Sequence, residues 1–235
     1  DSPAGQFRLL RLDTGQYAID PNCAVGIMET FFAAHPDFGR GGLFVVLPNM
    51  VFDWTTVAAE PDQQGLDQMK VQWLVANGYE LSNHTRDHVS LGDLTNDQIM
   101  YQLAEANIEI NKLAPDAPIR VVTLPFGIYP TGGDDTLLRG FDYNGQHFEW
   151  EAALLVGANP TVVPLSTEYD PYAMARIQAF DDELNKWFGV FEDNPGILYV
   201  SDGNPDTVTI PNDLHSWLVG TFDESKVHGR TVIRY

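Results

Sequence analysis

The chain has 235 residues, of which 44% are apolar, with a net charge of −20 and a single cysteine. This length suits one large domain or two small ones, and the apolar fraction is sufficient for a sizeable core. The negative charge argues against nucleic acid, an anionic membrane surface or a strongly acidic glycan as partner, because anions are bound by clustered Lys and Arg. Neutral and cationic polymers remain compatible with it.

The apolar runs are short, and the run at residues 43–47 is among the longest. A membrane helix needs about 20 apolar residues, so no membrane segment is predicted. No basic stretch followed by an apolar stretch opens the chain, so a signal peptide is absent or was removed. The lone Cys23 excludes an internal disulfide and a CxxC metal site, and its apolar neighbours predict a buried core thiol.

Three helices are predicted from apolar residues at three- and four-residue spacing. They cover residues 21–34, 66–77 and 95–113. The third has the clearest signal, because Thr95 and Gln98 form a capping box and one apolar stripe runs to Leu113. Between and beyond these helices, short apolar runs predict strands at residues 43–47, 79–82, 119–124, 152–156 and 197–200.

Strands that alternate with helices favour an α/β fold with a parallel sheet. Polar or Gly/Pro-rich residues follow each strand, as they do at the reactive end of a β/α barrel. Residues 128–147 and 157–175 read as long loops over one face. We expect one domain over residues 1–203, and residues 204–235 as an edge hairpin or the start of another module.

Two histidines, His84 and His88, follow the predicted strand at residues 79–82. On a helical turn, side chains four positions apart face the same way and can share one metal ion. The spacing alone is a weak signal, because a surface or structural role explains it equally well.

The surroundings of this pair resemble a known family. Ala76-Asn-Gly-Tyr-Glu-Leu-Ser-Asn-His-Thr-x-x-His88 is similar to the second motif of the polysaccharide deacetylases, the NodB-homology family, with the pattern G-H-E-[IL]-[GA]-N-H-[ST]-x-x-H. The run Leu43-Phe-Val-Val resembles the family's second strand, T-F-F-V. Thr123-Leu-Pro-Phe-Gly127 stands where the family has R-x-P-Y-G. The resemblance covers roughly residues 1–202.

The resemblance implies a distorted (β/α) barrel and a metal held by His84, His88 and an aspartate of the first motif, T-F-D-D-[GS]-P. Asp1-Ser2-Pro3 matches the end of that motif. Asp1 would then be the third ligand, with the first strand and the catalytic base missing from this sequence, and the fragment itself would be poorly active. The alternative, Asp13 followed by Thr14 and Gly15, keeps a base but lacks the second carboxylate, so Asp1 is preferred.

Two neutral imidazoles and a carboxylate leave open positions on Zn²⁺, or a similar divalent ion, for water and a substrate oxygen. Such an ion activates the water and polarises an acetamide carbonyl. The resemblance assigns substrate contacts, including a backbone N–H for the oxyanion, to Pro125, Phe126 and Gly127. Asn83 and Thr85 would orient the ligands.

The sequence departs from the family at two catalytic positions. Thr123 replaces the arginine that supports the base, and Arg176 is a candidate substitute. Ser201-Asp202 stands where the family has L-x-H, so the acid histidine is lost, and Asp202 or His215 is a candidate replacement.

The expected function is hydrolysis of N-acetyl groups, with O-acetyl groups as the less favoured alternative, on a chitin-like or peptidoglycan-like polysaccharide, outside the cell or in its envelope. One alternative is a catalytically impaired relative that binds glycan, which the lost arginine and histidine favour. The other is a metal-dependent amidohydrolase acting on a small molecule. A complete first motif upstream would favour an enzyme.

Overall fold

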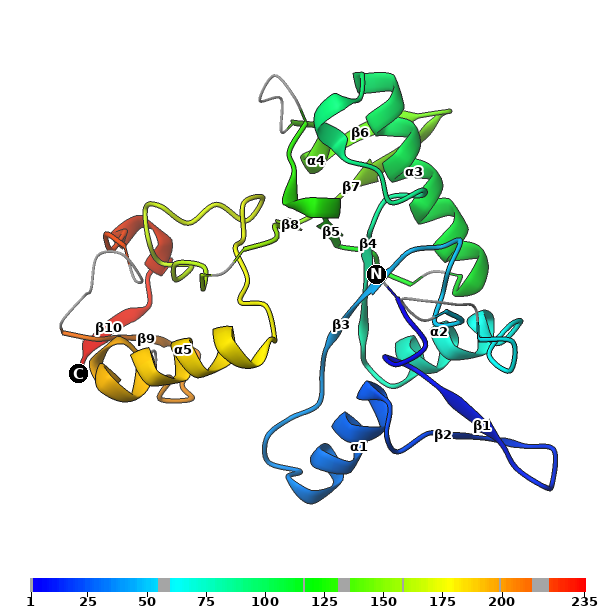
Figure 1. Ribbon diagram of the computed structural model, residues 1–235. Helices are drawn as coiled ribbons and strands as arrows, with labels where there is room; N and C mark the ends of the chain where they lie inside the picture. The colour runs from blue at the N-terminus through cyan, green and yellow to red at the C-terminus, as the bar shows by residue number, and fades with distance from the viewer. Residues whose placement is uncertain are drawn as a thin grey trace. The chain divides into compact units, whose positions relative to one another are not determined.

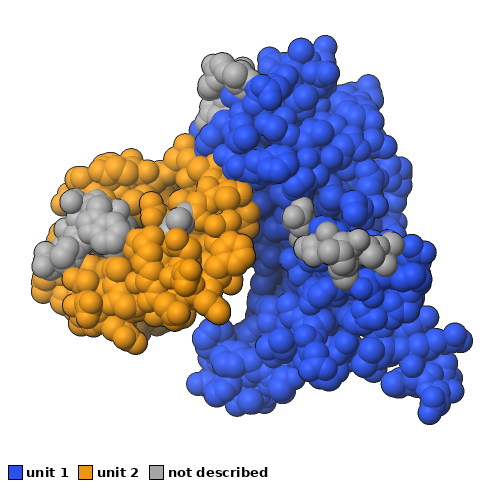
Figure 2. Space-filling view, in the orientation of Figure 1, with its two compact units in different colours: residues 1–152 blue, residues 153–235 orange. Residues whose placement is uncertain are grey.

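The computed structural model describes residues 2–54, 60–115, 117–130, 136–157, 159–198, 200–212 and 220–235. The chain divides into two compact units, residues 1–152 and 153–235 (Figure 2). The boundary expected between residues 203 and 204 falls inside the second unit and stays a prediction about the extent of the family domain. None of the helices in the described ranges is long and apolar enough to span a membrane.

A parallel sheet forms the centre of unit 1 (Figure 1). Its strands β3 (Leu43–Val46), β4 (Glu80–Asn83) and β5 (Val121–Thr123) are neighbours in this order. Val46 pairs with Asn83, and Asn83 pairs with Val122, so the carboxyl ends of the three strands meet at one edge. These strands, and β8 (Ala152–Leu154), confirm four of the predicted strands and the α/β class. Closure into a barrel stays a prediction.

The three predicted helices are confirmed as α1 (Ala24–Ala34), α2 (Asp67–Ala76) and α3 (Asn96–Leu113). The capping box is present, since the Thr95 hydroxyl accepts from the Gln98 N–H and the Gln98 side chain accepts from the Thr95 N–H. Helix α1 begins later than predicted, because the Cys23 Sγ caps it by accepting from the Gly26 N–H (3.4 Å). Cys23 is buried, as predicted.

The core of unit 1 packs α1, α2 and the end of α3 against the sheet. Removing a large buried side chain such as Leu74 by substitution with alanine should cost roughly 2–5 kcal/mol of stability. The N-terminal segment contributes Phe7, whose ring contacts Trp73 and Phe52 edge-on. Other members of the cluster include Val25, Phe44, Val46, Val71, Tyr79, Leu81, Ile110 and Ile119.

Two antiparallel hairpins in unit 1 were not predicted. Strands β1 (Leu9–Arg11) and β2 (Tyr17–Ile19) form the first, and β6 (Gly140–Tyr143) and β7 (Gln146–Glu149) the second. The short helix α4 (Thr136–Arg139) precedes β6. Residues 140–147 are therefore not the expected loop. Asn144-Gly145, both with positive φ between two strands, is the sequence signal of a tight hairpin turn and could have revealed it.

Unit 2 contains the helix α5 (Asp181–Asp193) and the strands β9 (Thr207–Ile210) and β10 (Thr231–Arg234). These strands pair in parallel, so the edge hairpin that was one expectation for the tail is wrong. The strand expected at residues 197–200 is also wrong for the described residues, because Pro195–Ile197 forms a 3₁₀ turn. The Tyr235 hydroxyl then donates to the Leu198 carbonyl and accepts from the Val200 N–H (both 2.7 Å), in place of a strand ladder.

Candidate functional site

The two predicted histidines lie at the carboxyl edge of the sheet, directly after β4. Their ring centroids are 4.8 Å apart, with the rings at 67° to each other. His84 is only 4% exposed, and its Nδ1 lies 2.7 Å from the carbonyl oxygen of Thr123 at the end of β5. A carbonyl only accepts, so this bond puts the proton on Nδ1 and the lone pair on Nε2. That is the tautomer in which a histidine binds metal through Nε2.

The histidines do not converge by helical spacing, as the sequence had suggested. Residues 84–88 form an irregular turn in which Thr85 (φ 62°) and His88 (φ 54°) are both left-handed. This conformation is unfavourable for a β-branched residue such as threonine, at a cost of about 1–3 kcal/mol. The surrounding structure therefore has to hold the turn in place.

Asn83 supplies part of that support. Its Oδ1 accepts from the Thr85 N–H (2.8 Å), and its Nδ2 donates to the Leu103 carbonyl (2.8 Å) and the Asn107 Oδ1 (2.6 Å) of α3. Asn83 is fully buried. It was predicted to orient the ligands, and its bonds fasten the strained residue between the histidines to the neighbouring helix.

Gln102 of α3 supplies the rest, and sequence reasoning missed it. Its Oε1 accepts from the N–H groups of Arg86 (3.1 Å) and Asp87 (3.0 Å), and its Nε2 donates to the Asp87 carboxylate (2.7 Å). A signal was present, since a glutamine near the middle of the α3 sequence stands one position before the apolar stripe residue Leu103. A polar side chain there satisfies the exposed backbone of a turn packed on the helix.

The loop after β3 connects the start of the chain to this turn. Asn49 Nδ2 donates to the Arg86 carbonyl (3.0 Å). The buried Ser2, near the start of the chain, bonds to the same loop. Its hydroxyl donates to the Met50 carbonyl (2.8 Å) and accepts from the Leu47 N–H (3.3 Å). Asp1 itself lies outside the described residues. Its chain neighbour Ser2 is thus bonded to the loop that also contacts the histidine turn.

A buried lysine also bonds to the loop that follows β3. Lys70 of α2 is fully buried, and its Nζ donates to the Phe52 carbonyl (2.6 Å). The N–H of Phe52 in turn donates to the Ser2 carbonyl (2.6 Å). Burial lowers the pKa of Lys70 to about 8, since the charged form loses hydration. Burial also raises the pKa of Asp53, next to Phe52.

The predicted substrate loop borders the histidines. Pro125–Gly127 forms a 3₁₀ turn after β5, in which Phe126 has a positive φ (58°). The Phe126 ring is 59% exposed, and its centroid lies 4.9 Å from that of His88. The Gly127 N–H donates to the Leu124 carbonyl (3.0 Å). Burial lowers the pKa of His88, which favours the neutral imidazole.

The two imidazoles fit a metal ion, and Asp1, the expected third ligand, lies outside the described residues. In the part of the chain that the structure describes, no three His, Cys, Asp or Glu side chains gather as a metal site. The hydroxyl of Thr85, the residue that follows His84 in the chain, is buried without a hydrogen-bond partner in the described chain. A polar group left in this way is explained when the site holds a further ligand.

The other candidate catalytic residues that the structure describes each bond to partners of their own. Thr123, which replaces the family's arginine, is buried with its hydroxyl 2.7 Å from that of Ser82. In unit 2, the Arg176 Nε donates to the Leu155 carbonyl (2.7 Å). The Asp202 carboxylate is exposed and accepts from the Thr207 hydroxyl (2.6 Å) and the Asn204 N–H (3.0 Å), and the first of these bonds lowers its pKa. His215 lies outside the described residues. The rival first-motif residue, Asp13, is exposed in the turn between β1 and β2.

Comparison with known proteins identifies the segment that carries the histidines. Residues 30–137 match the family model for polysaccharide deacetylase. A chitooligosaccharide deacetylase of Sinorhizobium fredii is 34% identical over 67 residues, which are 28% of this chain and 30% of that protein's length.

Two solved structures are similar to the chain at low identity. A deacetylase of Streptococcus pyogenes, PplD, in complex with acetate, is 14% identical with a TM-score of 0.47, over 70% of this chain and 63% of that one. A family 4 carbohydrate esterase from Bacillus anthracis is 12% identical with a TM-score of 0.38, over 72% and 69%. The resemblance seen in the sequence is confirmed by the family model for polysaccharide deacetylase, which matches residues 30–137 of this chain.

Proposed function

We propose that this chain is part of a metal-dependent hydrolase that removes acetyl groups from an acetylated carbohydrate. The observation that carries the proposal is the pair of imidazoles at the carboxyl edge of the sheet, with the Nδ1 of His84 fixed by the Thr123 carbonyl. The match of residues 30–137 to the deacetylase family supports the reaction class. N-acetyl groups on a chitin-like or peptidoglycan-like chain are the preferred substrate.

His84 and His88, with Asp1 as third ligand, would hold a divalent ion, most simply Zn²⁺. When bound, such an ion polarises the acetamide carbonyl and acidifies a water molecule. The Thr123 carbonyl keeps the proton on Nδ1 of His84, and Asn83 keeps the turn in its strained conformation. The backbone N–H of Phe126 would donate to the oxyanion, and the exposed Phe126 ring would exclude water from one side.

Hydrolysis also needs a general base and a general acid. The residue before Asp1 is the proposed base, as in the first motif of the family. The described residues offer a poor acid, because the hydrogen bonds that lower the pKa of Asp202 favour its ionised form. A second candidate function, a glycan-binding relative with little activity, is favoured by the buried Thr123, which carries no charge to support a base.

The test is acetate release from N-acetylated chitin oligomers. We expect release by the chain extended with the residues encoded before Asp1, loss of that release after chelation, and recovery on adding Zn²⁺. O-acetylated xylan oligomers and a small N-acetyl amide, supplied in parallel, separate the ester and small-molecule alternatives. Binding of the oligomers without acetate release in the extended chain would contradict the enzyme and leave the binding relative.

A further inference from the structure

Two adjoining hollows in unit 2 share the residues Pro164, Leu165 and Arg230 as walls. The first has a volume of about 420 Å³ and the second about 330 Å³, which is the range of cavities that hold small ligands. The second is completed by Val163, and Leu165 is buried in its floor. The additional residues that line the first hollow are Tyr169, Pro171, Lys226 and His228.

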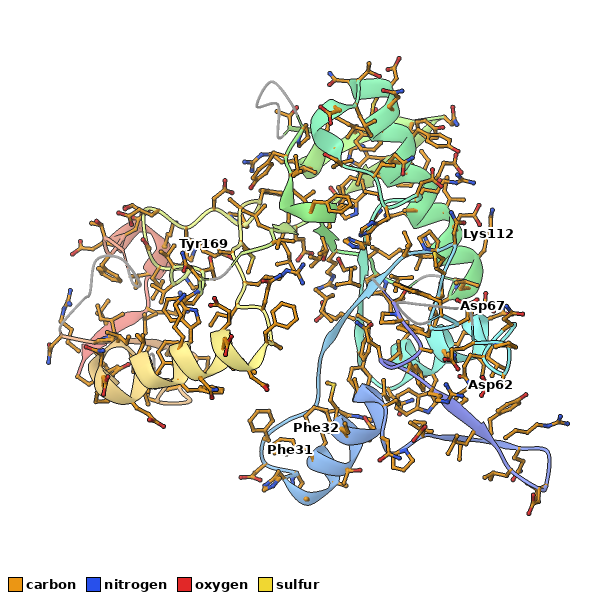
Figure 3. All side chains as sticks on the ribbon, in the orientation of Figure 1. Phe31, Phe32, Asp62, Asp67, Lys112 and Tyr169 are labelled. Carbon is orange, nitrogen blue, oxygen red and sulfur yellow. The ribbon has the colours of Figure 1, made fainter. Side chains whose placement is uncertain are left out.

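The first hollow gathers basic side chains from one segment, Lys226, His228 and Arg230, beside Tyr169 (labelled in Figure 3). The Lys226 Nζ donates to the Ser166 carbonyl (2.5 Å) and lies 5.6 Å from the Tyr169 ring centroid. The Arg230 Nε donates to the Val227 carbonyl (2.8 Å), which fixes the direction of the guanidinium. These contacts leave both side chains with further donors.

Neither Lys226 nor Arg230 has a carboxylate partner at ion-pair distance within the described ranges. Asp223, three positions before Lys226, interacts with that lysine electrostatically without an ion pair, and it and Glu168 both accept backbone hydrogen bonds. Glu168 accepts from the Thr221 N–H (2.8 Å), and Asp223 accepts from the Ser225 N–H (3.0 Å). In a chain with 13 Lys and Arg against 33 Asp and Glu, two of the few cations, Lys226 and Arg230, line the same hollow.

The second hollow has fewer basic residues in its lining than the first. It is lined by Val163, Pro164, Leu165 and Arg230, and the last three of these also line the first hollow. A ligand that filled both would place an anionic group against the basic side chains and an apolar body against Val163. Charge-assisted hydrogen bonds from Lys and Arg would hold the anion.

From this arrangement we infer that unit 2 binds a small organic anion, with a carboxylate or phosphate in the first hollow and an apolar body in the second. The site is formed by residues of unit 2 alone and does not depend on the proposed hydrolase activity. It uses residues beyond the segment matched by the deacetylase family.

The experiment is calorimetric titration of the whole chain at low ionic strength with four probes. Phenyl phosphate and benzoate carry the anion on an apolar ring, benzamide is the neutral analogue, and inorganic phosphate lacks the ring. We expect saturable binding of phenyl phosphate or benzoate, and the tighter of the two identifies the anionic group. Benzamide and inorganic phosphate should bind at least about tenfold more weakly.

Variants locate the site. Lys226→Gln and Arg230→Gln should each weaken binding of the anionic probe about threefold to tenfold. His228→Asn is a milder variant that suits the left-handed backbone there (φ 52°). Lys186→Gln on α5, with the same charge change, is the control and should bind as the wild type does. Thermal unfolding of each variant shows that it is folded.

Four outcomes would overturn the inference. One is the absence of saturable binding of either ring anion to the wild-type chain. Another is binding of benzamide as tight as that of the ring anions, which would show that the negative charge is not needed. Binding of inorganic phosphate as tight as that of phenyl phosphate would show that the apolar ring is not needed. The last is equal weakening by Lys186→Gln, which would indicate attraction by general charge and no specific site.

Discussion

In unit 1 the polar side chains around His84 are buried and bonded to one another, whereas in unit 2 the Asp202 carboxylate is exposed and bonds within its own turn. Polar side chains therefore have two structural roles in this chain, one between distant segments and one within a single turn. Asn83 joins a strained turn to a helix 20 or more positions away in sequence. Asp202 joins residues within five positions. Long-range buried bonds determine the geometry of the first region, so substitutions there should have the larger effects.

The largest expected effect is the loss of metal binding. His84→Ala and His88→Ala should each abolish stoichiometric binding of a divalent ion, because two remaining ligands hold Zn²⁺ poorly. Metal analysis after dialysis is the measurement. His147→Ala is the control, because that exposed histidine bonds to Asp142 (2.8 Å) in the β6–β7 hairpin. Full metal content in either ligand variant would end the assignment of the site.

Asn83→Ala should lower the free energy of unfolding by about 2–4 kcal/mol, because the Thr85 N–H and the Leu103 carbonyl lose their partner in a buried place. Chemical denaturation gives the value. Asn22→Ala removes an exposed amide bonded only to Asp20, and should change stability by less than about 0.5 kcal/mol. Equal losses in the two variants would remove the distinction between buried and exposed polar groups.

Stability should increase with pH in the range where Lys70 titrates. Its pKa is about 8 in the folded chain and near 10.5 when unfolded, so between these values the unfolded chain binds more protons. The burial penalty, on the order of 3 kcal/mol, is present below pH 8 and is relieved as pH rises. Lys70→Met should flatten the rise in unfolding free energy between pH 8 and pH 10.

This increase of stability with pH ends near pH 10. Burial raises the pKa of Tyr79 to about 12, so above pH 10 the unfolded chain loses the tyrosine proton before the folded chain does. Lys112→Met, at an exposed position on α3 (labelled in Figure 3), is the control and should keep the wild-type slope. A wild-type stability that stays level from pH 8 to pH 10 would contradict the effect of burial on Lys70.

Gln102→Leu should weaken metal affinity about tenfold to 100-fold while His84 and His88 are intact, since support of the ligand turn is lost. Competition with a chromogenic chelator measures the affinity. Gln72→Leu is the matched control, because its exposed amide donates only to the Leu113 carbonyl (3.1 Å). Unchanged affinity in Gln102→Leu would show that Asn83 alone holds the turn.

The smallest effect is expected in unit 2. Asp202→Asn should leave metal content unchanged and alter kcat/KM for acetate release by less than about threefold. The reason is that the carboxylate stabilises the turn between Asp202 and Thr207. The measurement is made in the extended chain. A loss of 100-fold or more, with stability retained, would restore Asp202 as a catalytic residue.

Local patterns in the sequence were enough to predict the helices and the parallel strands of unit 1. The capping box at Thr95 and the apolar stripe of α3 depend on residues within a few positions of one another. The histidine pair was found in the same way, because its motif is contiguous. The β6–β7 hairpin was missed, although the local signal Asn144-Gly145 indicates a tight turn. The parallel pair β9–β10 joins segments about 24 positions apart that share no local signal.

The sequence by itself determined which residues are chemically able to bind a metal, His84 and His88, because imidazole and the motif are properties of the residues. The tertiary structure decided how they converge. Their approach depends on left-handed backbone at Thr85 and His88, which is unfavourable in isolation. Only the packed α3 supplies Gln102 and the partners of Asn83 that make this conformation stable, and such bonds between distant segments cannot be read from local propensity.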